Sequence, residues 1–235
     1  MPRLTLLFPT YNECANIIPL IDATLALLPD AEIIVVDDSS PDGTGALVAR
    51  RAATDPRIRL ITRPYGAGLT SAFRDGIRAA SGALIGWCDC DFSHPPDYFP
   101  AMLRALADPE TDVVSASRYV SGARDARTDR LAVFASRLVN AIGRRLLTPE
   151  ITDYTTGFLM ARREVFAAIP LRGDYGEYCI DFLYRAWQAG FTVREIPYVS
   201  PPRRAGASKT ATNIMGFVRR APQYLRLMLF LRRES

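Results

Sequence analysis

Short apolar runs alternate with longer amphipathic segments along the first half of the chain. The apolar runs are Leu4–Phe8, Glu32–Val36, Ile58–Ile61, Leu84–Cys88 and Asp112–Ser117. The segments between them, at about residues 15–28, 44–51, 68–80 and 97–107, have apolar positions at helical spacing. Apolar strands that alternate with helices are typical of a mainly parallel sheet covered on both faces. The pattern therefore predicts an α/β fold.

The second half of the chain is less regular. Residues 121–129 are polar and predict a mobile loop over a site at the sheet edge. Further elements are expected as a long helix at Arg130–Leu147, a strand and short helix after residue 158, a helix at Glu177–Ala189 and a strand at Thr192–Val199. The last segment, Asn213–Arg233, predicts a basic amphipathic helix broken near Pro222.

Polar residues follow three of the predicted parallel strands. They are Tyr11 and Glu13, then Asp37 and Asp38, then Asp89 and Asp91. Ligands of such sheets gather at the carboxyl ends of the strands, so these side chains are expected at one site. A dinucleotide-binding dehydrogenase is disfavoured because the first strand is followed by PTYNE rather than a G-x-G-x-x-G loop, and the chain has no Walker motif.

The stretch LIGWCDCDFSHPPDY, residues 84–98, is the main candidate for chemistry. Alternation along a strand places Asp89 and Asp91 on one side and Cys88 and Cys90 on the other. Two adjacent carboxylates need a cation or water, and Mg²⁺ or Mn²⁺ bridging to a phosphate-bearing substrate would satisfy them. The alternative is a solvated turn capped by Asp91. For His94, the only histidine, a hydrogen-bonded structural role is favoured over a ligand or base.

Composition and charge exclude only a few classes of function. The chain has 235 residues, 49% of them hydrophobic, a net charge of +4 and a pI near 9.0. This excess suits phosphate-bearing ligands or an anionic membrane surface, although a solvated basic face would look the same. The four cysteines have neither zinc nor disulfide spacing, so a cytoplasmic protein without a signal peptide or spanning segment is expected. A nucleic-acid partner is not expected because no aromatic-rich basic face accompanies the charge.

Six motifs in order give a resemblance to a known family. They are PTYNE, VVDDSSPDGT, CDCDFSHPP, SRYVSG, DYTTGF and EIPYVSPPRRAGASK. Together they resemble the inverting family 2 glycosyltransferases of GT-A fold that act on polyprenyl phosphates, with dolichyl-phosphate mannose synthases as the most similar type. The resemblance implies a Rossmann-like nucleotide-diphospho-sugar transferase domain over residues 1–209 and a helical tail over residues 210–235.

The resemblance also implies roles for individual residues. The nucleoside pocket would be lined by Pro9, Tyr11, Glu13 and Asp38. Asp89 and Asp91 would hold Mg²⁺ or Mn²⁺, with Ser93 as a weaker third ligand where relatives often have Gln. The diphosphate or the acceptor phosphate would be contacted by Arg118, Arg203, Ser208 and Lys209, with Ser136 nearby. A basic pair usual before Ser136 is missing, and Arg130 is the nearest candidate to replace it.

The expected reaction is transfer of mannose or another hexose from a GDP- or UDP-sugar to a polyprenyl phosphate, with inversion. The acceptor phosphate is already ionised near neutral pH, so no strong base is needed. A hydroxyl acceptor would require one, for which Asp181 is the nearest candidate. A non-catalytic nucleotide-sugar-binding subunit is a further alternative, because Leu159 replaces a usual arginine and Ser93 alters the third ligand. The C-terminal segment predicts peripheral contact with the cytoplasmic membrane face; docking on the protein's own core, a membrane-protein partner or a homodimer remain alternatives.

Overall fold

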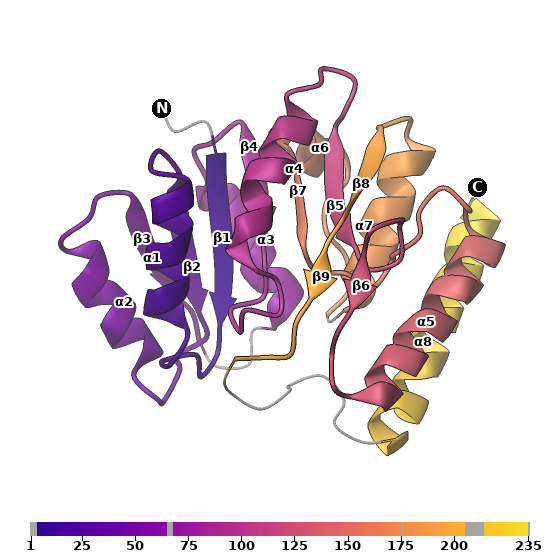
Figure 1. Ribbon diagram of the computed structural model, residues 1–235, viewed down its shortest axis with the longest axis horizontal. Coiled ribbons are helices and arrows are strands. Elements are labelled where there is room, and N and C mark those ends of the chain that lie inside the picture. Colours follow the sequence, from indigo (N-terminus) through magenta and orange to yellow (C-terminus); the bar gives the residue numbers. More distant parts are fainter. Residues whose placement is uncertain (1–3, 65–67, 175, 205–213, 235) are drawn as a thin grey trace.

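The computed structural model describes residues 4–64, 68–174, 176–204 and 214–234, with side chains of the last range described from Pro222 onward. Seven strands form one sheet in the order β3-β2-β1-β4-β7-β5-β8 (Figure 1). Their bounds are β1 Leu4–Thr10, β2 Glu32–Asp37, β3 Ile58–Thr62, β4 Leu84–Trp87, β5 Val113–Ser117, β7 Leu159–Arg162 and β8 Val193–Pro197. The first four are mutually parallel, as are β5 and β8. The predicted α/β fold with a mostly parallel sheet is confirmed.

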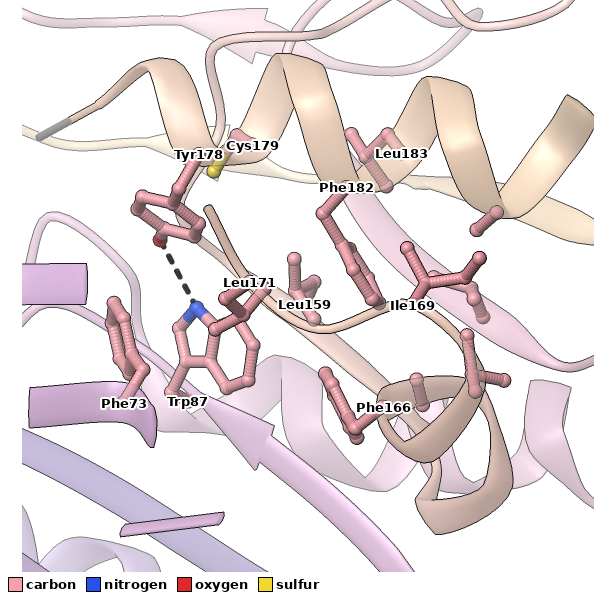
Figure 2. Packing of buried hydrophobic residues seen from close by; sticks show 14 of the residues in the cluster. Phe73, Trp87, Leu159, Phe166, Ile169, Leu171, Tyr178, Cys179, Phe182 and Leu183 are labelled. Carbon is pink, nitrogen blue, oxygen red and sulfur yellow. Dashed lines mark hydrogen bonds between the residues drawn. The ribbon is translucent and has the colours of Figure 1, made fainter. Parts of the chain in front are cut away.

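Helices cover both faces of this sheet. They are α1 Ile17–Leu27, α2 Thr44–Ala52, α3 Leu69–Ala79, α4 Phe99–Leu106 after the 3₁₀ turn η1 Pro96–Tyr98, α5 Arg130–Leu146, α6 Arg163–Ala168, α7 Glu177–Gln188 and α8 Ile214–Glu234. Each face has its own buried cluster, and alternation along β1 sends Leu7 into one and Leu6 and Phe8 into the other. In the first cluster Trp87 stacks on Phe73 and donates a hydrogen bond to the Tyr178 hydroxyl (Figure 2).

Two features of the sheet differ from the sequence prediction. Strand β7 is antiparallel to both neighbours, β4 and β5, because the chain enters it from the opposite direction after α5. A second, two-stranded sheet pairs β6 Arg124–Asp125 with β9 Val199–Ser200. Strands of two residues have no periodicity of their own, so only their pairing reveals them. This small sheet ties the loop before α5 to the segment after β8.

The C-terminal helix α8 runs through Pro222 without the expected break. Its Met228 and Leu231 are buried in the first core cluster, and the helix packs against α5 and α7. This packing offsets the backbone hydrogen bond that a proline removes from a helix interior. Among the described residues, no helix combines the length and apolarity needed to cross a membrane.

Candidate active site

A cavity of about 730 Å³ opens at the carboxyl ends of β1, β2 and β4. Most of the expected site residues line it: Pro9, Tyr11, Glu13, Asp38, Asp89, Asp91, Ser93, Arg118, Ser136 and Arg203. Arg130 is exposed at the first position of α5 and is not among the lining residues. Ser208 and Lys209 lie outside the described residues. The strand-end pattern thus brings together residues from distant parts of the sequence.

Asp38, which lines the cavity, forms an ion pair with Arg63 that was not predicted from the sequence. Arg63, which follows β3, is 5% exposed and donates from Nε to Asp38 Oδ1 at 2.8 Å. It also donates to the Ser71 hydroxyl at 2.8 Å and to the Gly68 carbonyl at 2.9 Å. Arg63 therefore fixes Asp38 against the start of α3. Arg63 could have been predicted from the sequence, because it is a polar residue directly after a parallel strand, like the site residues that follow β1, β2 and β4.

The loop after β1 is tied to the loop before α2. The Glu13 amide donates to Thr44 Oγ1 at 2.9 Å, and the Cys14 amide donates to Asp42 Oδ2 at 3.0 Å. Burial acts to raise the pKa of Asp42, but hydrogen bonds from Thr44 and Cys14 outweigh it and lower the pKa to about 2. An ionised Asp42 thus anchors the cavity wall that carries Tyr11 and Glu13.

The two carboxylates after β4 differ in environment. The Asp91 side chain is 2% exposed; its Oδ1 accepts a 2.9 Å hydrogen bond from the Ser93 amide, and its Oδ2 pairs with Arg203. The Asp89 side chain is 42% exposed, and no donor in the described part of the chain hydrogen-bonds its carboxylate. Cys88 and Cys90 are buried in the second core cluster, as strand alternation predicted. Both aspartates therefore present oxygen atoms at the cavity.

These residues fit a divalent cation of the magnesium type. Within the described ranges no third His, Cys, Asp or Glu joins Asp89 and Asp91 in a metal-binding group. Mg²⁺ is usually held by one or two carboxylates plus substrate phosphates, rather than by a complete protein cage. A pair of aspartates at the rim of a large cavity matches that donor set.

His94 supports the carboxylate loop. Its Nδ1 accepts a hydrogen bond from the Asp89 amide at 3.0 Å, and its ring stacks on Phe158 with 5.0 Å between centroids. Burial lowers the pKa of His94, which favours the neutral imidazole. The geometry matches the hydrogen-bonded structural role that the sequence favoured.

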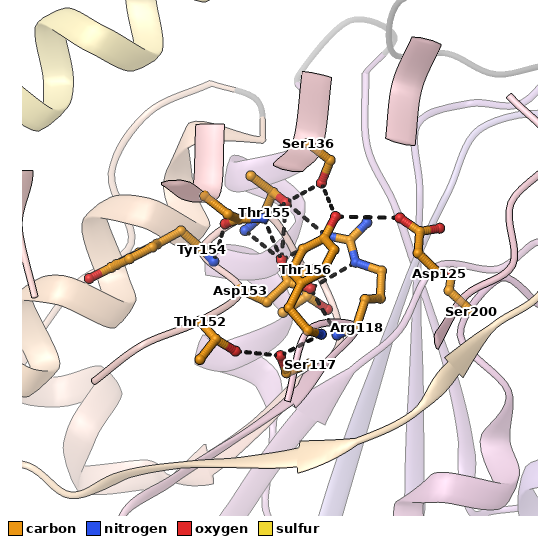
Figure 3. A network of polar contacts seen from close by, with 12 residues as sticks. Ser117, Arg118, Asp125, Ser136, Thr152, Asp153, Tyr154, Thr155, Thr156 and Ser200 are labelled. Carbon is orange, nitrogen blue, oxygen red and sulfur yellow. Dashed lines mark hydrogen bonds and ion pairs between the residues drawn. The ribbon is translucent and has the colours of Figure 1, made fainter. Parts of the chain in front are cut away.

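A buried polar network around Arg118 (Figure 3) also borders the cavity. Arg118 donates from Nε to Asp153 Oδ2 and from Nη2 to Asp153 Oδ1, each at 2.7 Å, and also to Thr155 Oγ1 at 2.7 Å. Ser136 Oγ lies 2.8 Å from Thr155 Oγ1. Asn140 donates to Asp153 at 3.2 Å, and its carbonyl oxygen accepts from the Tyr154 amide at 2.7 Å. Burial acts to raise the pKa of Asp153, but Arg118 holds it below its usual value.

Three members of this region were missed by sequence reasoning. Asp153 orients Arg118, Asn140 donates to Asp153, and Arg127 lines the cavity from the loop before α5. A buried asparagine on the core-facing side of an amphipathic helix is a signal that could have identified Asn140. Arg127 had no such signal, because it lies in a segment rich in charge.

Comparisons with known proteins agree with this arrangement. The model of the family Glycosyl transferase family 2 matches residues 5–169. A polyprenol monophosphomannose synthase from Mycolicibacterium smegmatis is 37% identical over 215 residues, which cover 88% of this chain and 80% of that protein. An undecaprenyl-phosphate mannosyltransferase from Micrococcus luteus is 31% identical over 222 residues, which cover 91% of this chain and 90% of that protein.

Solved structures share the fold at lower identity. A glucosyl-3-phosphoglycerate synthase from Mycobacterium tuberculosis, in complex with Mn²⁺, UDP and glucosyl-3-phosphoglycerate, has a TM-score of 0.71 at 21% identity, covering 96% of this chain and 79% of that one. A mannosyl-3-phosphoglycerate synthase from Rubrobacter xylanophilus has a TM-score of 0.69 at 18% identity, and the match covers 95% of this chain and 74% of that one. Fold, strand-end site and family match all agree, and the chain belongs to glycosyl transferase family 2.

Proposed function

We propose that this protein transfers a hexose, with mannose the first candidate, from a GDP- or UDP-sugar to a polyprenyl phosphate with inversion. The observation that carries the proposal is a single cavity that contains both a carboxylate pair suited to a divalent cation and a buried arginine suited to a phosphate. The Asp89 and Asp91 carboxylates line it, and so do the buried Arg118 and Ser136. The two relatives, named for mannosyl transfer to polyprenyl phosphates, support the same acceptor class.

The donor would occupy the side formed by the ends of β1, β2 and β4. The nucleoside would lie against Pro9, Tyr11, Glu13 and Asp38. Asp89 and Asp91 would hold Mg²⁺ or Mn²⁺, with the Ser93 hydroxyl as a further oxygen ligand. A bound cation neutralises charge on the leaving diphosphate. Arg203, already at Asp91, is positioned to contact the diphosphate, and Ser208 and Lys209 are proposed to act with it.

The acceptor phosphate would lie near Arg118 and Ser136. A phosphate monoester has a second pKa of about 6, so its oxygen can attack the anomeric carbon without a protein base. The structure favours this acceptor over a hydroxyl. Asp181, the candidate base for a hydroxyl, lines a separate cavity of about 120 Å³ with Arg172 and Leu227. Catalysis then consists of holding two anions in line and stabilising the leaving group.

A lipid acceptor also implies contact with a membrane, which we propose to be peripheral and on its cytoplasmic face. Helices α5 and α8 lie side by side (Figure 1). Most of the exposed large hydrophobic side chains in the described residues lie on these helices: Phe134, Leu138, Leu225, Leu229 and Phe230. Exposed arginines accompany them, including Arg137, Arg226 and Arg233. Apolar and basic side chains together suit the surface of an anionic bilayer.

The metal-side carboxylates provide the direct test. Asp91→Asn should keep the fold, because the amide can still accept the Ser93 hydrogen bond, yet reduce transfer to polyprenyl phosphate by about 100-fold or more. Radiolabelled GDP- and UDP-sugars with Mn²⁺ would measure the transfer. Asp97→Asn, an exposed aspartate outside the cavity lining, is the matched control and should leave transfer unchanged. Wild-type turnover by the Asp91 variant would contradict the proposed role.

A further inference from the structure

Arg127 lines the cavity, yet neither the motifs nor the comparisons give it a role. We infer that Arg127, held by Asp125, forms with Arg118 a two-arginine clamp for the phosphate of the acceptor. The inference rests on the proposed function and adds a specific phosphate-binding residue to it.

The position of Arg127 is fixed by a buried carboxylate. Its Nε donates to Asp125 Oδ1 at 2.8 Å and its Nη2 donates to Asp125 Oδ2 at 2.6 Å. The Asp125 side chain is fully buried, whereas that of Arg127 is 26% exposed. Burial acts to raise the pKa of Asp125, but Arg127 lowers it below its usual value, so the pair is ionised at neutral pH. The guanidinium is therefore held from its Nε and Nη2 side.

The backbone around this pair is equally constrained. Asp125 belongs to β6, and the flanking amides of Arg124 and Ala126 donate to the carbonyls of Tyr198 and Ser200 at 3.1 and 3.0 Å. Arg127 therefore follows a hydrogen-bonded ribbon and is not part of an unsupported loop. The ribbon brings its side chain to the cavity lining.

Arg118 repeats the same arrangement. It too donates hydrogen bonds from Nε and Nη2 to one buried aspartate, Asp153. In both arginines Nη1 has no acceptor among the described residues, so each has two N–H groups to offer a ligand. Their forks are pre-oriented by fixed carboxylates, which reduces the entropy lost on binding an anion.

A continuous polar chain joins the two arginines, and Figure 3 shows the part of it that runs from Asp125 to Arg118. Tyr119 connects them, because its hydroxyl lies 3.4 Å from Asp125 Oδ2 and 3.0 Å from Ser136 Oγ. Ser136 in turn reaches Thr155, which accepts from Arg118. Arg118, Arg127 and Ser136 thus all line one cavity, and each arginine keeps its Nη1 group for a ligand. Such a set suits the terminal oxygens of a phosphate monoester.

The test removes the Arg127 pair as a unit. Arg127→Met together with Asp125→Asn avoids leaving a buried carboxylate unpaired. In the full chain, the KM for a short-chain polyprenyl phosphate should rise about tenfold or more, because a charge-assisted hydrogen bond is lost. The KM for the donor should stay unchanged, and Arg127→Lys should be intermediate. Arg124→Met, an exposed arginine on the same ribbon and outside the cavity lining, is the matched control and should behave as wild type.

Several results would overturn the clamp. The first is an unchanged KM for the acceptor in the double variant while Arg118→Lys raises that KM. The second is a change in the KM for the donor and not in the KM for the acceptor. The third is a raised KM for the acceptor in Arg130→Met but not in the Arg127 variants. A thermal-shift measurement with a water-soluble prenyl phosphate tests the same point without turnover. Wild type should be stabilised and the double variant should not; equal shifts, or none in wild type, would contradict the clamp. Wild type could fail to transfer any sugar to polyprenyl phosphate and still be stabilised by the prenyl phosphate when the double variant is not. That result would reject the proposed reaction and not the clamp.

Discussion

Four arginine–aspartate pairs lie in or beside the cavity lining. Asp38 binds Arg63, Asp91 binds Arg203, Asp125 binds Arg127 and Asp153 binds Arg118. Sequence motifs identified several of these residues one by one. The long-range pairs could not be predicted, because the partners come from different strands and loops and only the fold brings them together. Arg118 illustrates this: its residue type suggested a phosphate ligand, but Asp153, 35 positions away, accepts two of its five guanidinium N–H groups.

At the residue scale, the Arg118 and Asp153 pair should contribute strongly to stability. Asp153→Asn leaves a buried guanidinium without its counter-charge, and we expect a loss of about 3–5 kcal/mol in the free energy of unfolding. Asp22→Asn, which removes an exposed pair with Arg51, should cost less than about 1 kcal/mol. Chemical denaturation of both variants measures the difference. Equal losses would contradict the structural role of the buried pair.

The same pair predicts a pH dependence. Because Arg118 holds the pKa of Asp153 below its usual value of about 3.9, the unfolded chain binds this proton first as pH falls. The stabilisation should be complete above about pH 4 and decline below it, as pH approaches the folded-state pKa. Denaturation curves of wild type and Asp153→Asn should therefore converge in acid. A difference that stays constant down to the lowest measurable pH would show that charge is not its source.

At the element scale, sequence periodicity located the strands and helices that have a pattern of their own. It did not show the reversed direction of β7 or the two-residue strands β6 and β9, because direction and pairing depend on partners elsewhere in the chain. The C-terminal helix shows the same limit. Its apolar and basic composition suggested a surface contact, but Met228 and Leu231 turn out to be core residues. Only part of its apolar surface remains exposed, next to that of α5.

The exposed apolar side chains of α5 should matter for membrane contact and little for stability. Phe134 and Leu138 are 65% and 51% exposed, so replacing both by Ser should leave the melting temperature nearly unchanged. Binding to vesicles that contain anionic lipid should weaken about tenfold or more, because each apolar side chain contributes on the order of 1.5 kcal/mol or more when buried.

Vesicle sedimentation measures this effect, and Leu27→Ser, which alters a 40% exposed leucine on α1, is the control. Equal vesicle binding by wild type and the α5 variant would contradict the proposed membrane face. A dimer in solution that dissociates in the α5 variant would instead identify the face as a contact between two copies of the chain.

At the scale of the whole molecule, the alternation of strands and helices and the polar strand ends were sufficient to predict the fold and the edge that holds the cavity. The family resemblance implied that Arg118 and Ser136, from the second half of the chain, contribute to the site, but the sequence did not show that the buried Asp153 fixes Arg118 there. Arg118 and Ser136 lie more than 25 positions beyond Asp91 yet line the same cavity, and the buried Asp153 binds Arg118. The proposed reaction assigns the donor to the residues around Asp89 and Asp91 and the acceptor to those around Arg118, so it depends on both.

The choice of acceptor is the decisive property of the proposed reaction. One labelled nucleotide sugar with Mn²⁺ is offered in parallel to a polyprenyl phosphate, to the polyprenol of the same length and to free saccharides. If the proposed reaction is correct, label enters only the polyprenyl phosphate, with release of one nucleoside diphosphate per sugar transferred. Label in the polyprenol or a saccharide, with none in the polyprenyl phosphate, would contradict it.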